Sequence, residues 1–165
     1  MHSLHVGLLS ASAAFFMSAP ASAEPIKPMR FFEGRTESVA TIKLMFKKPY
    51  RSHTVGRGAI APDGSLLLIQ QVEDEGMPPR ERRWRIRQIG AGHYAGTMSD
   101  AIGPVTIDEV NGGYRFRFKM KGNFAVEQWL APLPDGMSAH NSLKVRKYGM
   151  TVGSSDGMIR KVAGL

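Results

Sequence analysis

The sequence predicts an all-β protein, built as a single antiparallel barrel of about eight to ten short strands. Three observations support this prediction. Apolar and polar residues alternate through most of the chain after residue 31, and turn signals recur roughly every 8 to 12 residues. No stretch shows the apolar stripe of an amphipathic helix. A long antiparallel meander must also protect its edges, and closure into a barrel is the economical way to do so.

Composition limits the chemistry. The chain has 165 residues, which favours one domain, and 42% of them are hydrophobic, which is enough for a core. It contains no cysteine, so disulfides, thiolate metal sites, cysteine nucleophiles and lipidated cysteine anchors are excluded. The net charge is +8.

The first 23 residues have the features of a secretory signal peptide. They hold no Lys, Arg, Asp or Glu, they contain an apolar stretch over residues 6–17, and they end in the small tripeptide Ala21–Ala23. We expect cleavage after Ala23 and a periplasmic protein, with a buried N-terminal helix as the alternative. The apolar stretch is shorter than the roughly 20 residues that span a bilayer. No later stretch approaches that length, so we expect no transmembrane segment in the mature chain.

An extended leader is expected over residues 24–30, because it contains Pro25 and Pro28, and the barrel domain over residues 31–162. In the first strands, apolar and polar residues alternate with a period of two, and most of these strands end at turns rich in Gly or Pro. They are expected at residues 36–46, 52–60, 65–75, 81–89 and 93–99.

The later strands follow the same rule. Asn111, Gly112 and Gly113 form a tight hairpin signal, because Asn and Gly accept the positive φ of primed turns. Pro134, Asp135 and Gly136 mark another turn. The strands are expected at residues 104–110, 114–121, 125–132, 138–148 and 151–162.

One strand is especially clear, because successive side chains of a strand point to opposite faces. Its apolar face comprises Tyr114, Phe116, Phe118 and Met120. Its other face is wholly cationic and comprises Arg115, Arg117, Lys119 and Lys121.

Four motifs in order resemble the lipocalin-like family of bacterial envelope proteins catalogued as domain of unknown function 3833. The chain opens with Phe-Phe-Glu-Gly at residues 31–34, and an acidic turn at residues 73–76 precedes Arg-Arg-Trp at 82–84. Tyr94-x-Gly96 is followed by Asp100 and Gly103, and Asn141 is followed by Lys-Tyr-Gly at residues 147–149 and by Val152. The resemblance covers residues 31 to 161.

This resemblance implies a lipocalin-like (calycin-like) barrel and no assigned activity. The chain departs from the family in two respects. Many relatives look like lipoproteins, whereas this chain has no cysteine, and relatives carry an acidic residue beside the late tryptophan, where this chain has Gln128 before Trp129.

Charged residues beside the strand ends are the first candidates for a site. Arg82 and Trp84 share a face, so an inward Trp84 brings Arg82 inward, where it needs an acidic partner such as Glu73 or Asp100. Arg82 then either recognises an anion at the barrel mouth or closes the barrel floor as a structural residue. Glu73 or Asp100 could instead act as a general acid or base, or Glu73 could form a structural ion pair with the strand beyond the turn.

Aromatic residues are the second group. Trp84, Phe116, Phe118 and Trp129 either line a ligand cavity or fill the core. Asn141 and Lys147 are expected to have structural or ion-pair roles, as the resemblance draws attention to them. The sequence thus leaves three functions open: an envelope barrel that binds a small apolar or lipid-like molecule, a filled structural or interaction protein, and an enzyme.

The cations of residues 115–121 predict a basic outer face. Anionic lipid head groups fit it better than nucleic acid, because a signal peptide removes the protein from nucleic acid, and simple solubility is the alternative. His53, His93 and His140 lie on separate segments without ligand spacing, so neither a metal site nor a cofactor is expected.

Overall fold

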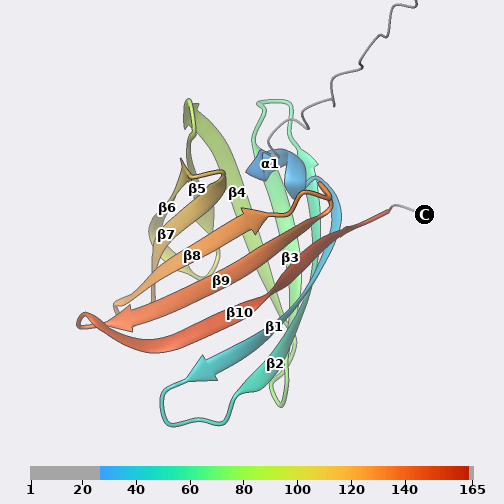
Figure 1. The fold of residues 1–165 in the computed structure, drawn as a ribbon. Helices are drawn as coiled ribbons and strands as arrows, with labels where there is room; N and C mark the ends of the chain where they lie inside the picture. Colours follow the sequence, from blue (N-terminus) through green and yellow to red (C-terminus); the bar gives the residue numbers. More distant parts are fainter. Residues whose placement is uncertain (1–26, 164–165) are drawn as a thin grey trace, which may run out of the picture.

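Ten antiparallel strands form a closed barrel in the computed structural model, which describes residues 27–163 (Figure 1). Each strand pairs with its sequence neighbours, and β1 pairs with β10 to close the barrel. The predicted signal peptide lies outside the described residues. The elements are α1 (Pro28–Phe31), β1 (Gly34–Leu44), β2 (Tyr50–Ile60), β3 (Leu66–Asp74), β4 (Arg80–Gly90), β5 (His93–Met98), β6 (Ala101–Val110), β7 (Gly113–Met120), β8 (Phe124–Pro132), β9 (Ser138–Lys147) and β10 (Met150–Val162).

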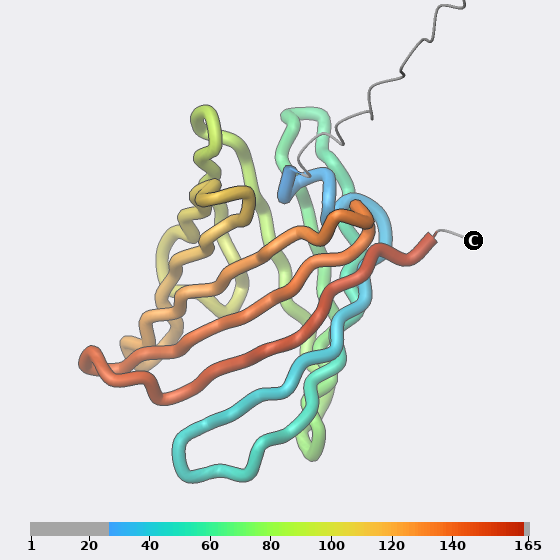
Figure 2. The backbone as a smooth tube through the Cα atoms, in the orientation of Figure 1, coloured from blue at the N-terminus to red at the C-terminus, as the bar shows by residue number. Residues whose placement is uncertain are grey.

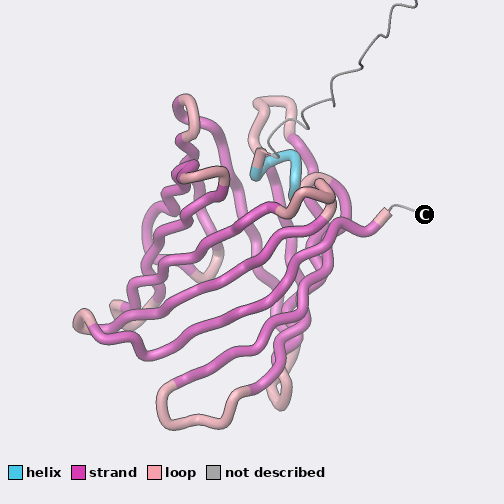
Figure 3. The backbone as a smooth tube through the Cα atoms, viewed as in Figure 1, coloured by secondary structure: helices cyan, strands magenta, loops and turns pink. Residues whose placement is uncertain are grey.

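The all-β barrel predicted from the sequence is therefore confirmed, with two local differences. Residues 28–30 belong to a turn of helix rather than to an extended leader, because a proline at the start of a helix supplies a suitable φ (Figure 3). Strand β6 starts at Ala101, and its pairing with β7 is irregular between Ile102 and Thr106. Pro104 lies in that stretch and has no N–H to donate to a ladder.

The barrel has two unlike ends. The chain enters β1 beside α1, so the turns that follow the even-numbered strands lie at the α1 end (Figure 2). The turns that follow the odd-numbered strands surround the opposite end, which is called the mouth below. These are β1–β2, β3–β4, β5–β6, β7–β8 and β9–β10.

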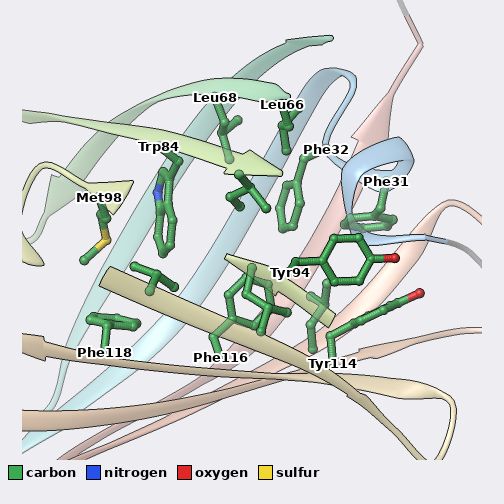
Figure 4. Packing of buried hydrophobic residues seen from close by; sticks show 14 of the residues in the cluster. Phe31, Phe32, Leu66, Leu68, Trp84, Tyr94, Met98, Tyr114, Phe116 and Phe118 are labelled. Atoms are coloured by element: carbon green, nitrogen blue, oxygen red, sulfur yellow. The ribbon is translucent and has the colours of Figure 1, made fainter. Parts of the chain in front are cut away.

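The α1 end is filled. Phe31, the last residue of α1, and Phe32 pack into the barrel with exposed fractions of 1% and 5%, and their rings meet edge to face (Figure 4). Gly58 permits this close packing, because a Cβ atom at this position would lie 2.0 Å from the carbonyl oxygen of Phe32. The Nζ atom of Lys161 donates hydrogen bonds of 2.9 and 3.0 Å to the carbonyl oxygens of Arg30 and Glu33 and so ties the helix to β10.

The alternation on β7 has the predicted consequence. Tyr114, Phe116 and Phe118 are buried inside the barrel, while the cations between them lie on the outer face. Trp84 of β4 meets the rings of Phe116 and Phe118 edge to face, with ring centroids 6.3 and 6.0 Å apart (Figure 4). This geometry suits the quadrupoles of aromatic rings.

Candidate functional site

A cavity of about 250 Å³ occupies the half of the barrel next to the mouth. Phe32 and Ile86 lie at its inner end, and Leu44, Tyr50 and Asp74 lie toward the turns of the mouth. Much of its wall is apolar and comes from Ile42, Leu68, Val72, Trp84, Phe116, Met120, Leu143 and Val145. The polar part of the wall includes Ser38, Ser52, Thr54, Gln70, Arg82, Gln128, Asn141, Ser154 and Ser155.

The predicted aromatic site residues divide into three groups. Trp84 and Phe116 line the cavity and also belong to the core cluster around it, so both alternatives that the sequence left open apply to them. Phe118 packs against Trp84 with an exposed fraction of 8% and belongs to the core around the cavity. Trp129 lies outside the barrel, opposite Arg115 on β7, and the guanidinium carbon of Arg115 is 5.7 Å from the centre of its ring. Trp129 therefore neither lines the cavity nor belongs to the buried core, so both alternatives for it are wrong, because the inward residues of β8 are Val126, Gln128 and Leu130.

Two arginines and two aspartates form an ion-pair network at the mouth. Arg80 bridges the carboxylates of Asp74 and Asp100 at 3.1 and 3.0 Å. The Nε atom of Arg82 donates to the same oxygen of Asp100 at 3.0 Å. Asp100 is thus the acidic partner that the sequence offered for Arg82.

Arg82 keeps hydrogen-bonding capacity inside the cavity. Its side chain lines the cavity and is 23% exposed. Only Nε has a partner among residues 27–163, so the two terminal nitrogens make no hydrogen bond to another described residue. Burial and, less strongly, the neighbouring Arg80 cation lower the pKa of Arg82, while Asp100 opposes them. The ordinary pKa is so high that the side chain stays cationic at neutral pH.

Glu73 does not take part in this network. It is exposed on the outer face, and its carboxylate lies 4.0 Å from the imidazole of His53 on β2. Asp74 is the inward residue and is only 8% exposed at its side chain. The alternation of β3 sends the two carboxylates to opposite faces, and sequence reasoning did not identify Asp74 or Arg80 as mouth residues. Asp74 pairs across the strands with Ser52, which also lines the cavity, and this pairing could not be read from the sequence.

Side-chain amides complete the polar wall. The Nε1 atom of Trp84 donates to the Oε1 atom of Gln70 at 2.8 Å, and the Nε2 atom of Gln128 donates to the Oδ1 atom of Asn141 at 2.7 Å. Asn141 is therefore a polar wall residue. Lys147 lies at the mouth, where its Nζ atom is 4.6 Å from the ring centre of Phe124.

The outer wall bears a second hollow, of about 490 Å³, across β7, β8 and β9. It is lined by Ile102, Pro104, Arg117, Phe118, Lys119, Ala125, Val126, Glu127, Lys144 and Arg146. Arg117 is already paired with Asp108 at 2.7 Å, and Arg115 lies 3.7 Å from the same carboxylate. Of the predicted basic face, Lys119 and Lys121 are therefore the cations for which no ion pair forms within the described part of the chain.

Neither a cluster of metal-ligating side chains nor a membrane-spanning helix occurs in the described residues. Within residues 27–163, no three His, Asp or Glu side chains gather as a metal site would require. The described part of the chain also has no helix long and apolar enough to cross a membrane.

Comparison with known proteins supports the fold and confirms the family that the sequence motifs resemble. A family model described as protein of unknown function (DUF3833) matches residues 6–161. The barrel is similar to an S-type phycobiliprotein lyase from Guillardia theta, with a TM-score of 0.64 and 7% identity over 82% of this chain and 92% of that chain. No curated protein matches the chain.

A second similar structure is a protein of unknown function from the DUF3598 family of Nostoc punctiforme. Its TM-score is 0.56 at 14% identity, over 84% of this chain and 50% of that chain. Both identities are low, so these likenesses show the fold alone.

Proposed function

Because the chain belongs to the DUF3833 family, whose description assigns no activity, we propose its function from the barrel itself: it is an exported protein that binds one small amphipathic, lipid-like molecule. The apolar part of the ligand lies in the inner cavity, and its anionic group pairs with Arg82. A barrel of similar fold in a phycobiliprotein lyase is compatible with small-molecule binding.

The cavity is what makes a ligand plausible. Its volume of about 250 Å³ is slightly below the roughly 300–1,000 Å³ of typical ligand pockets, which favours a small or slender molecule. Apolar side chains from β3, β4, β7 and β9 would accept a hydrocarbon chain. Water binds weakly beside this apolar part of the wall, because it finds few hydrogen-bond partners there.

The free nitrogens of Arg82 are the single observation that supports an anionic ligand most strongly. A guanidinium presents donors in a planar fork that matches a carboxylate or a phosphate. In Arg82 the terminal part of this fork has no protein acceptor among residues 27–163, although the side chain is mostly buried. These two nitrogens are accessible from the cavity, since the buried unpaired side-chain nitrogen among residues 27–163 is instead the Nε atom of Arg115, so the oxygen of a ligand in the cavity can reach them.

The enzyme alternative has less support. Asp74 and Asp100 are engaged by Arg80 and Arg82, and Glu73 is outside the cavity. A general acid or base must reach the proton of its substrate, and the carboxylates of the mouth are instead held by the two arginines. The filled structural barrel is disfavoured by the cavity.

Arg82→Gln should remove the preference for an anion. We expect the wild-type protein to bind decanoate about 10- to 100-fold more tightly than decanol, because hydrogen bonds to charged groups contribute roughly 1.5–3 kcal/mol. The variant should bind both with similar affinity. Titration calorimetry measures the four dissociation constants, and thermal denaturation confirms that the variant is folded.

Arg83→Gln is the matched control, because Arg83 is the next residue, points outward and has a side chain that is 71% exposed. It should keep the wild-type preference. An Arg82→Gln protein that still prefers decanoate would disprove the role of the arginine. Failure of both probes, with native mass spectrometry showing no co-purified molecule, would disprove ligand binding.

Export rests on the sequence of residues 1–23, which lies outside the described residues. We expect the periplasmic fraction of a Gram-negative host to contain a chain that begins at Glu24, because signal peptidase requires small residues such as those of Ala21–Ala23. N-terminal sequencing reads this directly. A full-length chain beginning at Met1, recovered only from the cytoplasm, would show that the segment is not a signal.

An anionic membrane surface is the second proposed partner. Lys119 of the predicted basic face, together with Lys144 and Arg146 of β9, places cations around the outer hollow, and Lys121 follows β7 in the adjoining turn. Each cation near an anionic surface contributes about 1 kcal/mol. Arg115 and Arg117 belong to the same face but share Asp108, which reduces their contribution.

A further inference from the structure

The turns around the mouth expose unusually apolar side chains. Phe46 in the β1–β2 turn is 98% exposed, Tyr148 in the β9–β10 turn is 82% exposed, and the adjoining Met150 is 61% exposed. Large apolar residues at such exposure on the tips of turns commonly mark a surface that meets another phase or molecule.

The backbone at two of these tips is also strained. Phe46 and Tyr148 have φ values of 62° and 50°, in the left-handed region that glycine or asparagine normally occupies. Tyr148 and Gly149 form the tight connection between the paired residues Lys147 and Met150. A smaller residue would suit either position better, so the aromatic side chains are not explained by the needs of the turn.

Cations accompany these apolar residues. Lys47 and Lys48 follow Phe46, and the Nζ atom of Lys147 lies 5.7 Å from the ring centre of Tyr148. No ion pair engages these three lysines within residues 27–163. The mouth patch is the group formed by Phe46, Lys47, Lys48, Lys147, Tyr148 and Met150.

The patch occupies one side of the mouth. The order β2-β1-β10-β9 makes the β1–β2 and β9–β10 turns neighbours around the barrel. Asp74 and Asp100 of the inner network belong to the β3–β4 side, where arginines neutralise them. Glu75 in the β3–β4 turn is exposed and accepts a hydrogen bond of 3.1 Å from the backbone N–H of Arg51, without an ion pair within residues 27–163. An anionic surface would therefore meet the lysines without facing an unpaired carboxylate of the inner network.

We propose that the mouth patch docks on an anionic lipid bilayer, so that the cavity opens toward the membrane. Phe46, Tyr148 and Met150 enter the region of the head groups, where aromatic residues are favoured, and the lysines contact lipid phosphates. The inference rests on the proposed function, because a docked mouth gives a lipid-like ligand a direct entry to the cavity, but docking is measured separately from ligand binding.

Binding to vesicles tests the proposal. We expect the mature protein to sediment with vesicles of phosphatidylglycerol and phosphatidylethanolamine, to bind vesicles of phosphatidylcholine weakly, and to dissociate as salt is added. The double variant Phe46→Ser/Tyr148→Ser should bind at least about tenfold more weakly. Lys47→Gln/Lys48→Gln should weaken binding to the anionic vesicles and reduce its dependence on salt.

Matched controls lie at the α1 end. Ile89 and Leu133 are exposed apolar residues there, with exposed fractions of 60% and 38%, so Ile89→Ser/Leu133→Ser should bind vesicles like the wild type. Arg57→Gln/Arg87→Gln changes two exposed cations far from the mouth and is the control for the lysine pair. Thermal denaturation shows that each protein is folded.

A labelling experiment reports the orientation. The chain has no cysteine, so a single Phe46→Cys or Ile89→Cys variant carries one environment-sensitive fluorophore. On adding anionic vesicles, we expect a blue shift and higher intensity from position 46 and no change from position 89. Equal responses from both positions would contradict docking through the mouth.

The remaining outcomes separate this proposal from the others. Wild-type protein that binds decanoate but neither kind of vesicle would overturn docking and leave the cavity proposal intact. Loss of vesicle binding in Arg117→Gln/Lys119→Gln, with full binding by Phe46→Ser/Tyr148→Ser, would assign docking to the outer wall and overturn the mouth proposal. Arg82→Gln should dock normally, since Arg82 is inside the barrel.

Discussion

Phe118→Ala should lower the free energy of unfolding by about 3–5 kcal/mol, the range observed for aromatic residues truncated in packed cores. Phe118 is 8% exposed and meets Trp84 edge to face, so its removal leaves a void that the rigid strands cannot close. Urea denaturation followed by circular dichroism gives the change in the free energy of unfolding.

Leu143→Ala is the informative comparison. Leu143 lines the cavity and is only partly buried, so its truncation should cost less than the roughly 2–5 kcal/mol of a leucine in a packed core. The two variants together measure how sharply packing changes between the core around Trp84 and the cavity wall. If each variant loses the free energy of unfolding expected for its residue in a packed core, the cavity does not exist in solution.

Ala40→Trp should abolish ligand binding. Ala40 of β1 faces the cavity, and an indole there would occupy much of the space of about 250 Å³. Because the space is open, the new side chain should cost less stability than the roughly 1–3 kcal/mol of overpacking a filled core. We expect the affinity for decanoate to fall by at least about 100-fold, because the ligand would clash with the indole ring. Titration calorimetry with decanoate measures this loss.

Thr41→Trp provides the control on the same strand. Thr41 is the next residue, is exposed and points away from the cavity, so a tryptophan there should leave the affinity unchanged. Wild-type affinity in Ala40→Trp would place the ligand elsewhere and direct attention to the hollow across β7, β8 and β9. Equal losses in both variants would indicate damage to the barrel rather than a blocked site.

The strands could be predicted because apolar and polar residues alternate along them with a period of two. Alternation fixes which residues of a strand share a face, and this was sufficient for β7 and for the inward direction of Arg82 and Trp84. Turn residues fixed where most strands end. Ten strands predicted in this way correspond to the ten observed, with the largest difference at β6, where Pro104 interrupts the ladder and the strand nevertheless continues.

The cavity was less predictable, because it depends on which strands face each other across the barrel. Ser38, Ser52 and Ser154 appear as ordinary strand residues in the sequence, and their meeting in one wall follows only from closure of β1 with both β2 and β10. The prediction for Trp129 fails because its position in the alternation of β8 places it on the outer face. The pairing of Trp129 with Arg115, a residue that the alternation of β7 already put outside, would have corrected it.

The seam between β1 and β10 has a consequence for the order of folding. Every other ladder joins strands that are adjacent in the sequence, so those hairpins can form as the chain emerges. The seam joins Arg35 to Val162 and needs the last strand that the structure describes. Until that strand arrives, β1 offers an unpaired edge to any other chain. Closing the seam is therefore the slow, non-local step, and the period before it is when this protein is most exposed to aggregation.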